Sequence, residues 1–145
     1  MDVITRSRTA ILVVTVAVLY LFLRHALFAN RPVFVFAQIV AAALMLWARL
    51  TFGLRSFHGA ANATAGGVQT RGPYRWIRHP IYAAILLFVW SGVSAHPSLG
   101  SIGAGAIASV GTAVRIVAEE RLVLAQYPEY AEYAARTKRL IPYIF

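Results

Sequence analysis

The sequence predicts an all-α membrane protein with about four transmembrane helices. Of its 145 residues, 59% are hydrophobic and only 13% are charged, and the mean hydropathy is +0.65. An ordinary soluble domain carries about 25% charged residues, so this chain needs lipid as its solvent. The apolar runs extend almost from end to end, and the length matches about one folding unit. We therefore expect a single membrane-embedded domain that comprises residues 1–145.

Four apolar stretches approach the length of about 20 helical residues that the hydrocarbon core of a bilayer requires. Asn30-Arg31-Pro32 predicts a turn after the first stretch, and His96-Pro97 predicts a tight turn that makes the third and fourth a hairpin. Gly103 and Gly105 in the fourth stretch predict close helix packing. The predicted spans cover residues 9–29, 33–52, 80–95 and 98–114.

Residues 115–145 predict a helical tail outside the membrane. Charged residues alternate here with apolar ones, and Tyr127-Pro128 predicts a break followed by a second helix with Pro128 in its first turn. Positive residues favour the cytoplasmic side of a membrane. Placing both termini and residues 53–80 in the cytoplasm, with Arg49 at the adjoining end of the second span, leaves 12 of the 14 Lys and Arg residues on that side. We therefore expect a multi-pass membrane protein with cytoplasmic N- and C-termini.

The net charge of +9 indicates membrane lipids rather than nucleic acid as partners. Its basic residues lie between apolar spans, whereas a nucleic-acid module displays them as a solvated patch. The chain has no Cys, and His25, His58 and His96 are isolated from acidic residues, so we expect no metal site. The oligomeric state stays open.

Aromatic and basic residues gather at the entrance of the third span, in Gly72-Pro73-Tyr74-Arg75-Trp76-Ile77-Arg78-His79-Pro80-Ile81-Tyr82. One interpretation is an interfacial belt, since Tyr, Trp and Arg commonly anchor helix ends. The other is an anion site, because Arg78 and His79 adjoin a first helical turn whose N–H groups lack intrahelical acceptors. Both interpretations place this segment at the membrane surface.

A second charged segment, Arg115-Ile116-Val117-Ala118-Glu119-Glu120-Arg121, lies where the fourth span leaves the lipid. Arg115 and Glu119 are four residues apart and therefore share one helix face. They could form only an intrahelical ion pair, worth about 0.2–0.5 kcal/mol. Charges so near the bilayer are costly unless paired or hydrated, which favours a functional site.

Together these segments resemble the isoprenylcysteine carboxyl methyltransferase and phospholipid methyltransferase family of integral membrane enzymes. The matching pattern covers about the last 80 residues: Gly72-x-Tyr74-x-x-x-Arg78-His79-Pro80-x-Tyr82, Arg115-x-x-x-Glu119-Glu120, Tyr130-x-x-Tyr133 and Arg139-Leu140-Ile141-Pro142. The resemblance implies S-adenosylmethionine-dependent methyl transfer to a lipid-like or otherwise membrane-partitioned acceptor.

The resemblance also implies a cofactor site on the cytoplasmic side. Glu119 would bind the cofactor and Arg115 would face the methyl acceptor, so these two are the predicted catalytic residues. The sequence departs from the family at Gly66-Gly67-Val68-Gln69, where a His and an apolar pair are usual, and contacts there are expected through the main chain. The predicted cofactor-binding residues are Gly67, Val68, Gln69, Tyr74, Arg78, His79, Pro80, Ile81, Tyr82, Glu119 and Glu120.

The residue types suit this cofactor. His79 and the helix N–H groups match its carboxylate and Glu119 matches its ammonium. The rings of Tyr74, Tyr82, Tyr130 or Tyr133 could cover the adenine or face the sulfonium, at about 0.5–2 kcal/mol. Two other functions remain open: an NADPH-dependent membrane reductase related to sterol reductases, and a non-catalytic membrane subunit. The acceptor also stays open among an isoprenylated cysteine, an amino-phospholipid, a small amine and a quinone-like lipid.

Overall fold

The computed structural model describes residues 3–53 and 67–144, and over these ranges the protein is helical with no β-strand. This confirms the all-α prediction. A single isolated bridge pairs Ile77 with Lys138 in parallel. The elements are α1 (Val3–Leu23), α2 (Pro32–Phe52), the 3₁₀ helix η2 (Gly72–Arg75), α3 (Pro80–Ala95), α4 (Leu99–Gln126) and α5 (Tyr130–Arg136).

Three of the described helices, α1, α2 and α4, are long and apolar enough to cross a membrane, and α3 is a shorter apolar helix of 16 residues. Many large apolar side chains of α1 and α2 are exposed, among them Leu12, Phe22, Phe36 and Leu50. A water-soluble monomer rarely exposes apolar surface on this scale, so these faces suit a lipid environment. The helices indicate a membrane protein.

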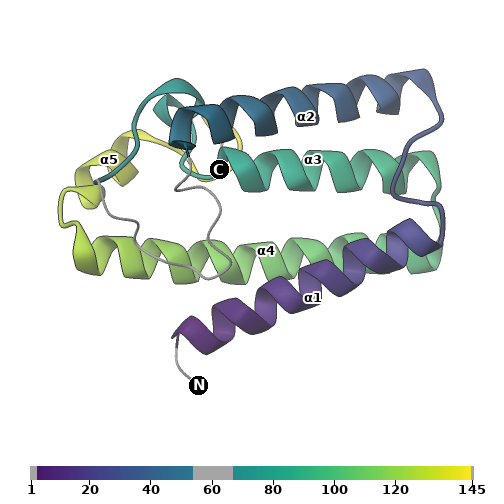
Figure 1. Ribbon diagram of the computed structural model, residues 1–145, viewed down its shortest axis with the longest axis horizontal. Helices are drawn as coiled ribbons and strands as arrows, with labels where there is room; N and C mark the ends of the chain where they lie inside the picture. The colour runs from purple at the N-terminus through teal and green to yellow at the C-terminus, as the bar shows by residue number, and fades with distance from the viewer. Residues whose placement is uncertain (1–2, 54–66, 145) are drawn as a thin grey trace.

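The long helices run back and forth, so that α1 begins, α2 ends, α3 begins and α4 ends at the same end of the bundle (Figure 1). α1 packs on α4 and α2 packs on α3. Close approach depends on glycine: a Cβ at Gly111 would lie 2.7 Å from Cγ2 of Val14. A Cβ at Gly105 would lie 3.3 Å from the Trp90 ring, whereas at Gly103 no atom lies within 4 Å. Of the two glycines predicted to allow packing, only Gly105 makes a close contact.

The first helix ends earlier than predicted, at Leu23 rather than residue 29. His25 adopts a positive φ of 54°, which turns the chain, and the apolar residues after it form a link instead of a further helical turn. The buried side chain of Gln38 holds this link: its Nε2 donates to the carbonyls of Leu27 (2.8 Å) and Phe88 (3.2 Å), and its Oε1 accepts from the N–H of Ala29 (3.0 Å). One polar residue thus satisfies three backbone groups of an otherwise apolar region.

The predicted fourth span and the helix predicted to follow it up to Tyr127-Pro128 form one helix, because α4 continues through Arg115 to Gln126. It begins with a capping box in which the Ser98 hydroxyl accepts from the Ser101 N–H and the Ser101 hydroxyl accepts from the Ser98 N–H. The predicted break at Tyr127-Pro128 is confirmed, but Pro128 precedes α5 rather than standing in its first turn. The long α4 carries its charged end directly to the predicted site.

Candidate functional site

A cavity of about 300 Å³ lies at the end of the bundle where α2 ends and α3 begins. The start of α3, the charged end of α4, α5 and the segment 67–69 all contribute to its wall. Segments distant in sequence therefore meet around one space.

Eleven of the twelve predicted site residues line this cavity. Glu120 does not line it, and Gly66 lies outside the described residues. The lining residues among the predicted set are Gly67, Val68, Gln69, Tyr74, Arg78, His79, Pro80, Ile81, Tyr82, Arg115 and Glu119.

The entrance of α3 and the charged end of α4 meet at Glu119. The Nδ1 atom of His79 lies 3.8 Å from Oε2 of this carboxylate. The hydroxyl of Tyr82 donates to Oε1 of Glu119 (2.5 Å) and accepts from Nε of Arg115, and Nη2 of Arg115 lies 3.2 Å from the same Oε1. His79 and Arg115 are buried, while the Glu119 side chain keeps 22% of its surface exposed. The carboxylate is therefore held in place yet still accessible from the cavity.

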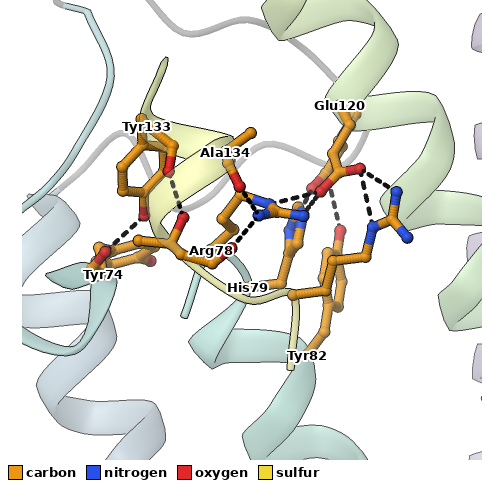
Figure 2. Close-up of polar contacts among 10 residues, drawn as sticks. Tyr74, Arg78, His79, Tyr82, Glu120, Tyr133 and Ala134 are labelled. Carbon is orange, nitrogen blue, oxygen red and sulfur yellow. Dashed lines mark hydrogen bonds and ion pairs between the residues drawn. The ribbon is translucent and has the colours of Figure 1, made fainter. Parts of the chain in front are cut away.

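Tyrosines from η2 and α5 form an aromatic part of the wall. The Tyr133 hydroxyl donates to the carbonyl of Tyr74 (2.6 Å; Figure 2). The centroid of the Tyr74 ring lies 5.4 Å from that of the Phe52 ring. Burial raises the pKa of Tyr74 and of Tyr130 above the ordinary value, and it raises the pKa of Tyr133 to about 12. These phenols are neutral at physiological pH, so the wall can cover a flat aromatic group.

The Gln69 side chain fixes its own loop. Its Nε2 donates to the carbonyl of Thr51 at the end of α2 (2.9 Å), and its Oε1 accepts from the N–H groups of Thr70 (3.1 Å) and Arg71 (3.2 Å). Gly67 has a φ of +80°, a backbone conformation that favours glycine. The Gln69 amide is therefore occupied within its own loop, and the main-chain contacts expected for residues 67–69 stay a prediction.

Glu120 lies behind the cavity wall, where it binds cations from two other segments. Its Oε1 accepts from Nε of Arg78 (2.9 Å) and lies 3.3 Å from Nε2 of His79, and its Oε2 lies 3.0 Å from Nε and from Nη2 of Arg139 (Figure 2 shows the Arg78 and His79 contacts). The structure thus places one of two neighbouring carboxylates at the cavity and the other in an ion cluster. The predicted direct cofactor contact of Glu120 has no support in this position.

Sequence reasoning missed several residues of the wall. Arg49 is the clearest, because this charged residue in the last turn of α2 lines the cavity. A charged residue at the end of an apolar helix could have been recognised from the sequence as a candidate site residue. The apolar residues of α1 that line the cavity could not, because they are of the same residue types as their lipid-facing neighbours. The missed residues are Ile11, Val14, Arg49, Phe52, Ile85, Thr112, Val123 and Tyr127.

Compared with known proteins, the chain shows no significant match to a family model, to a curated protein or to a solved structure. Residues 3–53 and 67–144 contain no group of three or more His, Asp and Glu side chains that could hold a metal ion. The chemistry of the cavity must therefore be argued from its own residues.

Proposed function

We propose that this chain is a membrane methyltransferase that uses S-adenosylmethionine and acts on a lipid-like or membrane-partitioned acceptor. The observation that carries the proposal is the convergence of Glu119, Arg115, the start of α3 and three tyrosines on one cavity at the end of an apolar bundle. In this proposal α1 to α4 each cross the membrane, α3 and α4 form a hairpin, and both termini are cytoplasmic.

The lining groups fit the charged parts of this cofactor. The N–H groups of Ile81 and Tyr82 belong to the first turn of α3, which favours an anion such as a carboxylate. The carboxylate of Glu119 suits an ammonium. In the structure His79 faces carboxylates, so its part in the fit is to hold Glu119 rather than to bind an anion.

The neutral aromatic wall of Tyr74, Tyr130 and Tyr133 suits an adenine ring or a sulfonium, the latter through cation–π attraction. Bound S-adenosylmethionine supplies the activated methyl group, and the protein orients the reactants and excludes water. Arg115 lies beside Glu119, where its guanidinium can also bind an acidic group of an acceptor.

The apolar side of the cavity supports a lipid-like acceptor. Ile11 and Val14 of α1, Ile85 of α3 and Thr112 of α4 line it at the level of the apolar helices. An acceptor with a hydrocarbon chain can bury that chain here, at about 25 cal/mol per Å² of apolar surface removed from water.

The size of the cavity favours this function over an NADPH-dependent reductase. Its volume of about 300 Å³ is at the low end of the range of about 300–1,000 Å³ for small-molecule sites. A dinucleotide needs more room than a mononucleoside such as S-adenosylmethionine. A non-catalytic subunit with the same fold would keep the cavity and differ in activity alone.

The test is ligand-dependent stability of the purified protein in detergent or nanodiscs. We expect S-adenosylhomocysteine to raise the melting temperature and NADPH to leave it unchanged. A ligand at 100 times its Kd stabilises the folded state by about 2.7 kcal/mol. The matched variants are Glu119→Gln, which should lose the effect, and Glu132→Gln on the exposed face of α5, which should retain it.

Transfer of a radiolabelled methyl group from the cofactor to components of a membrane extract then separates an enzyme from a non-catalytic subunit. The labelled product also identifies the acceptor. Ligand binding without transfer to any extract would contradict the enzymatic proposal, and stabilisation by NADPH alone would favour the reductase.

A further inference from the structure

The ion cluster behind the cavity wall joins three parts of the chain at Glu120. Arg78 and His79 come from the segment before α3, Arg139 comes from the segment after α5, and Glu120 itself lies near the end of α4. The Glu120 side chain is 15% exposed and the Arg78 side chain 9% exposed, so water screens this cluster only weakly. No oxygen of Glu120 is left without a cationic partner, and the residue does not line the cavity.

The same cluster attaches α5 to the entrance of α3. Nη1 of Arg78 donates to the carbonyls of Ala134 (2.8 Å) and Thr137, at the end of α5. Two backbone bonds continue the attachment, from the N–H of Arg78 to the carbonyl of Lys138 (2.7 Å) and from the N–H of His79 to the carbonyl of Arg139 (3.0 Å). The segment that α5 leads into is therefore tied to the α3 entrance by both side chains and main chain.

The attached segment supplies part of the cavity wall. Tyr130 and Tyr133 of α5 line the cavity, and both are buried. His79 adds a second connection, because its Nε2 faces Glu120 while its Nδ1 faces Glu119. The position of Glu120 thus affects both the aromatic wall and the carboxylate that the cavity exposes.

We propose that Glu120 is a positioning residue, which holds α5 and His79 against the cavity and does not itself touch the ligand. This inference rests on the proposed function, because it assigns Glu120 a role in forming the S-adenosylmethionine site. Without its carboxylate, Arg78 and Arg139 lose their shared anion, and the end of α5 is held less firmly against the α3 entrance, by the remaining bonds of Arg78 and the main chain alone. Cofactor affinity then falls because the tyrosine wall is no longer in place before the ligand arrives.

The experiment compares Glu120→Gln with Glu132→Gln, a matched control on α5 whose ion pair with Arg136 is exposed on both sides. We expect Glu120→Gln to weaken S-adenosylhomocysteine binding about tenfold, the low end of the effect of one lost hydrogen bond to a charged group. It should raise KM for the cofactor by a similar factor and leave kcat at saturation nearly unchanged. A residue that only stabilised the fold would lower the active fraction, and hence kcat per mole of protein, without changing KM.

Hydrogen exchange in the ligand-free protein shows whether α5 is held less firmly against the α3 entrance. Amide hydrogen exchange of residues 127–144 should become faster in ligand-free Glu120→Gln, while the control and the exchange of α1 stay unchanged. Arg139→Gln, at the more exposed edge of the cluster, provides a second variant if Glu120→Gln does not fold. Combining the two changes should weaken binding less than the product of their separate factors, because both break the same contact.

Unchanged affinity in Glu120→Gln would overturn the proposal. Weaker affinity with unchanged exchange in residues 127–144 would also overturn it, because Glu120 would then act at the ligand directly. If the wild-type protein binds no S-adenosylhomocysteine, the proposed function fails. Faster exchange in Glu120→Gln would in that case support its role in holding α5, and unchanged exchange would refute that role as well.

Discussion

Tyr82→Phe tests the polar centre of the cavity with the smallest change of shape. The ring stays, and only the hydroxyl that lies between Glu119 and Arg115 is removed. That hydroxyl donates to Oε1 of the carboxylate at 2.5 Å and accepts from Nε of the guanidinium. The direct contact of 3.2 Å between Arg115 and Glu119 remains.

The expected cost follows from the two contacts that are lost. A hydrogen bond to a charged group is worth about 1.5–3 kcal/mol, and the variant removes two while leaving Nε of a buried arginine without this acceptor. The surviving ion pair and some rearrangement offset part of this. We therefore expect a loss of about 2 kcal/mol in unfolding free energy and about a tenfold loss of S-adenosylhomocysteine affinity.

The assay is thermal or denaturant unfolding in nanodiscs together with a ligand titration, with Tyr143→Phe as the control. The Tyr143 side chain is 86% exposed, so removing its hydroxyl should change neither quantity. If the Tyr82→Phe protein is as stable as the control and binds S-adenosylhomocysteine with wild-type affinity, the reasoning is wrong, because the hydroxyl then contributes nothing to the arrangement of the cavity.

Three further predictions concern the bundle and its aromatic wall. Gly92→Ala should destabilise the protein by about 1–3 kcal/mol in unfolding experiments, because its Cβ would collide with the carbonyl of Leu27, whereas Gly103→Ala has open space and should stabilise it by up to about 1 kcal/mol. Gln38→Leu should cost about 3 kcal/mol, since three backbone groups each lose one hydrogen bond, and a loss below 1 kcal/mol would contradict the role given to the amide. Burial raises the pKa of Tyr133 from 10.0 to about 12, so its neutral phenol stabilises the fold below pH 10 and this contribution disappears as pH rises to 12. The stability difference between wild type and Tyr133→Phe should shrink over that window, and a difference independent of pH would refute the assignment.

The bounds of α2 and α3 followed from local signals in the sequence. α3 has the predicted bounds of 80 and 95, with Pro80 at its start and His96-Pro97 after its end. α1 was placed six residues too late at both ends, because the chain turns at His25 and the apolar residues Ala26 and Leu27 are buried in a link rather than in a helix. The bonds that stabilise this link come from Gln38 in the next helix, and no local pattern contains that information.

The site was predictable where order and spacing place residues at one end of the bundle. Successive residues on a helix point about 100° apart, so one of Glu119 and Glu120 can line the cavity while the other faces away from it. Spacing alone does not tell which, and the choice depends on Arg139, which returns from beyond α5 to bind Glu120. The contributions of Ile11 and Val14 depend on the packing of α1 against α4, a long-range contact with no sequence motif.

Photolabelling tests the central claim most directly. The purified protein is irradiated with radiolabelled S-adenosylmethionine and digested, and the labelled peptides are mapped, with excess unlabelled S-adenosylhomocysteine as the competitor. We predict competed label in the peptides that carry Tyr74 to Tyr82 and Tyr127 to Tyr133, because those side chains line the cavity. Label that the competitor does not displace, or label confined to the lipid-facing residues of α1 and α2, would contradict the account.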